Sequence, residues 1–166
     1  MYKLLYPAAH FFTARSPTST VLSPAALVNL PDSQGWSAIH YCVSLPLPSV
    51  RILDALFLAG ADINLYTADH CASPLHCLAR APRDGNEQDS SFQLYSFIVH
   101  LVQDLGASLR TIDANGDTCL HVAAEDGQSL DVLMALLDCD TTGTVRKIQN
   151  ARGYVSPLYY PAPMHV

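Results

Sequence analysis

The chain has 166 residues and a net charge of −6; 49% of its residues are hydrophobic and only 14% are charged. This balance predicts a folded chain with a packed core and argues against a disordered one. The acidic sign and the scattered basic residues argue against direct binding to nucleic acid. No apolar run approaches the length of a membrane-spanning helix, so we expect no membrane segment.

Five cysteines at irregular positions indicate a reducing compartment rather than a disulfide framework. We therefore expect an intracellular protein, either cytoplasmic or nuclear. A secretory signal peptide is the alternative, because Lys3 is followed by apolar residues near the N-terminus. Pro7 and His10 interrupt that stretch and no clear cleavage site follows, so the alternative is weaker.

Residues 1–31 are expected to form an N-terminal cap or a degenerate first repeat. Within them, Ser23 and Pro24 precede the apolar run 25–30. A serine side chain accepts free backbone N–H groups at a helix start, and proline suits the first turn. A short helix is therefore predicted here.

One local pattern then recurs along the chain. A turn-forming stretch leads to a serine or threonine, and a histidine follows three residues later; the pairs are Ser37 with His40, Ser73 with His76, and Thr118 with His121. The turns contain Gly35 and Gly116, whereas Cys71 stands at the glycine position of the second copy, so its hairpin is expected to be distorted. The hydroxyl residues are predicted helix caps.

Each copy is followed by a second apolar segment. In the first copy we predict an amphipathic helix at 50–58, which Gly60 terminates. We predict the corresponding helices of the next two copies at 92–105 and 129–137. A fourth hairpin and helix start are predicted at 148–158. The polar stretch 80–91 lengthens the second copy by about twelve residues beyond a period of about 33. We expect it to form an exposed loop.

These motifs resemble the ankyrin repeat, whose signature is T-P-L-H-x-A. The resemblance implies an all-α solenoid of stacked helix-turn-helix units with short hairpin loops, and a non-catalytic role in protein–protein interaction. The implied array covers 32–166, with units at about 32–67, 68–112 and 113–149 and a partial unit at 150–166.

The recurring histidines also permit a chemical interpretation. Equal spacing along a stack places neighbouring imidazoles roughly 10 Å apart, too far for shared ligation of a metal; we expect each ring to tie its unit to the next. A zinc site at His70, Cys71, His76 and Cys77 lacks a second ligand pair at finger spacing. The serine–histidine pairs suggest nucleophilic catalysis, but their repetition favours helix capping. No cofactor or metal is expected.

The resemblance places partner contacts at the hairpin tips and on the inner-helix face. The expected contact residues are Ser33, Gln34, Trp36, Ser44, Leu45, Asp69, His70, Arg80, Asn115, Asp117, Glu125 and Asp126. Trp36 is expected either as an exposed interface anchor or packed onto the N-terminal cap. Glu125 and Asp126 predict an anionic pocket for a basic peptide, or a solvated face. Asn64 matches a position that is hydroxylated in some ankyrin domains, and its alternative role is hairpin hydrogen bonding.

The favoured function is a module that binds a protein or peptide partner through its concave groove and hairpin tips, within a larger scaffold or regulatory protein. The first alternative is a transcription-regulatory cofactor subunit that holds a transcription factor. The second is an enzyme or small-ligand sensor that uses 80–91 as a lid. Partner identity and oligomeric state are not encoded in these motifs.

Overall fold

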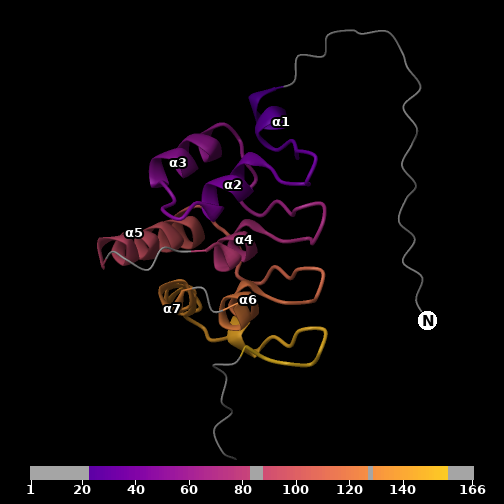
Figure 1. Ribbon diagram of the computed structural model, residues 1–166, viewed down its shortest axis with the longest axis vertical. Helices are drawn as coiled ribbons and strands as arrows, with labels where there is room; N and C mark the ends of the chain where they lie inside the picture. Colours follow the sequence, from indigo (N-terminus) through magenta and orange to yellow (C-terminus); the bar gives the residue numbers. More distant parts are fainter. Residues whose placement is uncertain (1–22, 83–87, 127–128, 157–166) are drawn as a thin grey trace, which may run out of the picture.

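The fold of this computed structural model is a stack of paired helices with a row of hairpins along one side (Figure 1). The structure describes residues 23–82, 88–126 and 129–156. The inner helices are α2 (Ala38–Ser44), α4 (Pro74–Arg80) and α6 (Cys119–Asp126), and the outer helices are α3 (Val50–Leu58), α5 (Gln88–Val99) and α7 (Leu130–Cys139). The predicted all-α class is confirmed: the described residues contain no strand, only an isolated antiparallel bridge between Gln149 and Val155.

Four hairpins stack beside the inner helices, at 32–36, 67–72, 113–117 and 150–154 (Figure 1). In the first, the Asp32 carboxylate accepts the backbone N–H groups of Gln34 and Trp36 at 2.9 and 3.0 Å. Asp113 and Asn150 make the same pair of bonds in the third and fourth hairpins. An Asx side chain therefore sets each of these turns.

The second hairpin carries one extra residue. Thr67 closes it by donating its N–H to the Ala72 carbonyl, five residues on, whereas Asp32 and Asp113 pair with residues four positions ahead. Cys71 takes the glycine position with a φ of +52°. A side chain in this left-handed region is disfavoured, so the expected distortion is confirmed.

A continuous core runs through the stack between the inner and outer helices. Its fully buried side chains come from every unit and include Ile39, Leu53, Leu75, Phe97, Leu120 and Leu136. Because each unit buries its apolar face against its neighbours, the units stabilise one another and do not form separate cores.

Helix α1 (Pro24–Val28) lies at the N-terminal end, and Ser23 caps it by accepting the Ala26 N–H at 3.2 Å, as predicted. Beyond it, the Asn29 amide donates to the Gly60 carbonyl and accepts the Asp62 N–H, both at 2.8 Å. Asn64 makes the equivalent bonds to Gly106 and Ser108 one unit later. Helix α1 therefore meets the first unit as an outer helix of a preceding unit would.

The start predicted for the second outer helix is wrong. Helix α5 begins at Gln88, four residues before the predicted Phe92, and its last turn becomes the π-helix η1 (His100–Asp104). Part of the stretch expected as a loop is thus helical, because α5 packs along α7: Ser91 donates to Asp131 at 2.6 Å and Tyr95 to Asp138 at 3.3 Å. Residues 83–87 lie outside the described part of the chain.

None of the helices in the described ranges combines the length and apolar character needed to cross a bilayer.

A 3₁₀ turn, η2 (Val145–Lys147), connects α7 to the fourth hairpin. Its position is fixed by Asp140, whose carboxylate accepts the backbone N–H groups of Thr144, Val145 and Arg146.

Candidate protein-binding face

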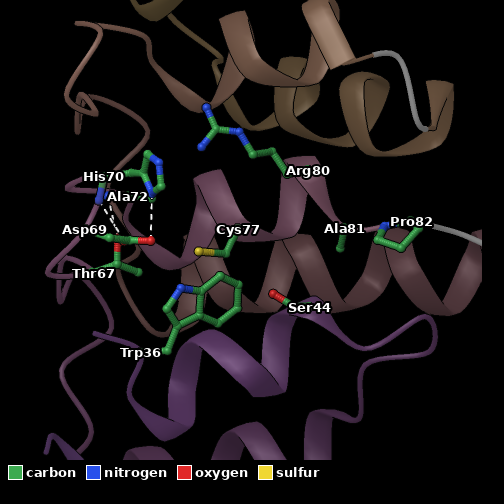
Figure 2. Close-up of a pocket in the computed structure, with 10 residues that line it drawn as sticks. All are labelled: Trp36, Ser44, Thr67, Asp69, His70, Ala72, Cys77, Arg80, Ala81 and Pro82. Carbon is green, nitrogen blue, oxygen red and sulfur yellow. Dashed lines mark hydrogen bonds and ion pairs between the residues drawn. The ribbon is translucent and has the colours of Figure 1, made fainter. Parts of the chain in front are cut away.

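A cavity of about 190 Å³ opens where the first two units meet, between the hairpins and the inner helices (Figure 2). Its walls come from the first and second hairpins, from helices α2 and α4 and from the start of the following loop. The lining residues are Trp36, Ser44, Thr67, Asp69, His70, Ala72, Cys77, Arg80, Ala81 and Pro82. The cavity thus brings together five of the predicted contact residues, Trp36, Ser44, Asp69, His70 and Arg80.

The only tryptophan of the chain forms one wall of this cavity (Figure 2). The Trp36 side chain is half-buried, and its ring lies 5.3 Å from that of Tyr41 and 6.0 Å from that of His40, tilted against both. The indole is thus partly rather than fully exposed, and its contacts with other rings lie within its own unit. Its expected role as an interface anchor stays a prediction.

Asp69 and His70 form a polar rim at the hairpin side of the cavity. The His70 Nδ1 lies 2.7 Å from an Asp69 oxygen, and the His70 backbone N–H also donates to the carboxylate at 2.7 Å. A hydrogen bond from the Thr67 side chain, followed by those from His70, lowers the pKa of Asp69 to about 2. The rim therefore carries a negative charge at every physiological pH, with 39% of the Asp69 side chain exposed.

Arg80 lies at the other edge, at the end of α4. Its Nη2 donates to Asp113 Oδ2 at 3.1 Å, and the Asp113 side chain is only 1% exposed. Because the same carboxylate also accepts N–H groups of its own hairpin, Asp113 is held in place from two sides. The guanidinium charge is consequently balanced by a buried carboxylate of the third unit.

A second hollow, of about 280 Å³, lies between α6 and the fourth hairpin; it is lined by His121, Glu125, Asn150, Arg152, Tyr154 and Val155. Here Arg152 Nη1 lies 3.4 Å from Glu125 Oε1, and both side chains are more than half exposed. A tip arginine of the next unit thus faces the Glu125 carboxylate, and the anionic pocket expected at Glu125 and Asp126 stays a prediction. Asp126 ends α6, and its side chain is not among those the structure describes.

Most of the other predicted contact residues are accessible. Ser33, Gln34 and Asn115 are exposed at the hairpin tips, and Leu45 is exposed just after α2. The exception is Asp117, which is 2% exposed. Its carboxylate accepts the Asn150 side-chain amide at 2.7 Å and its carbonyl accepts His76, so the expected partner contact at Asp117 is wrong: the residue joins neighbouring units instead.

Two of the three recurring histidines connect neighbouring units. In His40, His76 and His121, Nδ1 accepts the backbone N–H of the cap residue at 3.1–3.2 Å. The proton must therefore be on Nε2. This nitrogen donates to a carbonyl of the following unit in His76, to Asp117 at 2.8 Å, and in His121, to Tyr154 at 3.1 Å, whereas His40 donates to Leu65 at 2.9 Å, near the end of its own unit. The interpretation of these rings as ties between units is confirmed for His76 and His121.

The family model of the ankyrin repeat matches residues 115–143, which span the third hairpin, α6 and α7. The two preceding units repeat its paired helices and its bond between a histidine Nδ1 and the cap residue, and the first and fourth hairpins repeat its closure. Residues 115–143 therefore form an ankyrin repeat, and the described helices form an all-α stack consistent with an ankyrin solenoid. No curated protein matches it. Ankyrin repeats serve in general as protein-interaction modules and are typically not catalysts.

In this ankyrin stack the serine–histidine pairs are structural. Ser73 Oγ lies 2.7 Å from His76 Nδ1, but both residues are buried and the imidazole is engaged at both nitrogens. Burial also raises the pKa of the Cys77 thiol to about 12, so the thiol stays protonated and is a poor metal ligand. Across the described ranges no group of three or more histidine, cysteine or acidic side chains is arranged to hold a metal.

Sequence analysis missed two polar pairs on this face. Arg80 and Asp113 are 33 positions apart, as are Asp117 and Asn150. This separation equals the repeat period of about 33 residues. Polar residues one period apart lie on adjacent units, and that spacing was the available signal.

Proposed function

We propose that the chain is a non-catalytic interaction module that binds a segment of a partner protein along the face made by the hairpins and the inner helices. The observation that carries this proposal is the cavity between the first two units. At about 190 Å³ it is smaller than the 300–1,000 Å³ typical of small-molecule sites, and it suits a single side chain of a larger partner.

The surroundings of the cavity favour a preformed site. Trp36 and Arg80, two residue types enriched at interface hot spots, line it. Trp36 is held by the Tyr41 and His40 rings, and Arg80 by Asp113, before any partner arrives. A prearranged site loses less conformational entropy on association, which favours binding.

A matched pair of substitutions tests the proposal. Ser44→Leu places an apolar side chain in the cavity, and the lost Ser44 hydroxyl bonds only to a carbonyl of its own helix. Ser96→Leu makes the same change at a half-buried residue of outer helix α5, in a separate groove with Leu47 and Phe92.

Affinity capture with mass-spectrometric identification is run in parallel on the unsubstituted chain and both variants. We expect partners that are retained by the unsubstituted chain and by Ser96→Leu but lost by Ser44→Leu. If Ser44→Leu retains every partner while melting at the same temperature as Ser96→Leu, the proposed binding face is wrong.

A further inference from the structure

We propose that the cavity between the first two units selects a partner segment in which an apolar side chain lies two residues from a lysine or arginine. This inference rests on the proposed function and adds the chemistry of the partner to it. The apolar side chain fills the cavity, and the neighbouring basic side chain pairs with the Asp69 carboxylate on the hairpin side.

The case for an apolar anchor comes from the walls. Trp36, Ala72, Cys77, Ala81 and Pro82 present carbon and sulfur surface to the space between them (Figure 2). The Ser44 hydroxyl is already committed to the His40 carbonyl at 2.8 Å. A polar side chain placed among these groups would lose its hydration without gaining a partner, whereas an apolar one gains contact area.

The case for a basic neighbour comes from the uneven charge of the rim. Asp69 stays ionised because its oxygens accept hydrogen bonds from Thr67 and His70. On the opposite edge, the positive charge of Arg80 is offset by the carboxylate of Asp113. The excess charge next to the cavity is therefore negative and lies at the hairpin edge, where Figure 2 shows Asp69 on the side away from Arg80.

The geometry of an extended segment matches this arrangement. Successive side chains of an extended chain point to opposite sides, and residues two apart lie on the same side. A segment that lies between the hairpins and the inner helices can thus insert one side chain into the cavity. A nearby lysine or arginine, with its long flexible stem, then reaches the exposed carboxylate.

The test uses short synthetic peptides as probes, identical except at two positions. One set holds leucine as the anchor with lysine, glutamine or glutamate two residues away, and a fourth peptide holds serine as the anchor two residues from lysine. Trp36 is the sole tryptophan, so its fluorescence reports directly on occupancy of the cavity. Binding is titrated on the full chain, on Asp69→Asn and on Asp131→Asn, a control that changes net charge equally on outer helix α7.

We expect the leucine–lysine peptide to bind about three- to fivefold more tightly than the leucine–glutamine peptide, the effect of one exposed ion pair. That preference disappears in Asp69→Asn and persists in Asp131→Asn. Ser44→Leu weakens binding by about tenfold or more, as loss of an interface anchor does.

Preference for glutamate, equal binding of all three leucine peptides, tighter binding of the serine peptide, or no binding of any peptide overturns the inference. The capture experiment separates this failure from that of the proposed function. If Ser44→Leu still loses natural partners, the binding face stands and only the assigned partner chemistry is wrong. If Ser44→Leu keeps them, both fail.

Discussion

His100 Nε2 lies 2.7 Å from Asp54 Oδ1, and this contact joins the π-helix η1 of the second unit to α3 of the first. The other ring nitrogen lies 2.7 Å from Asp104. Since carboxylates only accept hydrogen bonds, both nitrogens must donate, and the ring is an imidazolium in this arrangement. The two carboxylates, Asp54 first, raise the pKa of His100.

The first prediction is a pH dependence set by His100. Its pKa is raised in the folded state, so the stabilisation is complete below about pH 6.5 and is lost as the pH rises through the raised pKa. We expect His100→Gln to lower the free energy of unfolding near pH 6 by about 0.5–1 kcal/mol, because the ion pairs are partly exposed. The deficit shrinks as the pH rises through the raised pKa of His100.

Urea unfolding at several pH values measures this effect, with Asp54→Asn as the companion variant. Asp54→Asn removes the contact between units and leaves the Asp104 contact within η1, so it is expected to show part of the same pH dependence. A His100→Gln deficit that is equal at both ends of the pH range would show that the ring acts through packing and not through charge.

The second prediction concerns the bond between His76 and Asp117. His76 is fully buried, so its removal leaves a void in the core. It also leaves the Ser73 N–H and the Asp117 carbonyl without their hydrogen-bond partner. His76→Ala is expected to cost about 2–4 kcal/mol of unfolding free energy. His70→Ala, at an exposed tip histidine, is expected to cost under about 0.5 kcal/mol. Similar midpoints for the two variants in chemical denaturation would contradict this assignment.

The third prediction compares two hairpin glycines. Both adopt a positive φ, but only one also lies against the neighbouring hairpin. Gly116 has a φ of +76°, and an added Cβ would lie 2.8 Å from the Ala151 nitrogen; Gly153 has a φ of +79° but nothing within 4 Å. Gly153→Ala should cost about 1–2 kcal/mol for the backbone conformation alone. Gly116→Ala should cost more, because the fourth hairpin must also move. Calorimetric melting of both variants checks the order, which would be reversed or absent if the hairpins were not stacked this closely.

The fourth prediction compares two arginine pairs of the binding face. Arg80→Gln removes the side-chain cation beside the buried Asp113 carboxylate and is expected to cost about 1–3 kcal/mol. Arg152→Gln removes the partner of Glu125 in an exposed pair and is expected to cost no more than about 0.5 kcal/mol. Equal losses in thermal unfolding would mean that Asp113 is stabilised by its own hairpin alone.

The local elements of this fold could be read from the sequence because their signals are local. Ser37, Ser73 and Thr118 lie just before inner helices whose third residue is a histidine, and Gly60 follows the end of α3 with a φ of +94°. A cap or a left-handed stop depends on residues within one turn, so the pattern is sufficient.

The start of α5 and the orientation of side chains on the binding face depend instead on neighbouring units. Residues 88–91 look like a loop by composition, and only packing against α7 makes them helical. Trp36 and Asp117 both occupy the hairpin residue before a helix cap, yet one lines a cavity and the other is buried between units.

The histidine bonds also have a direction. Every donor, at His40, His76 and His121, precedes its acceptor at Leu65, Asp117 and Tyr154 in the chain. Each imidazole is therefore translated before the carbonyl that accepts its hydrogen bond. A chain that ends between His76 and Asp117 lacks the carbonyl that pairs with His76 Nε2, so we expect its last unit to be less stable.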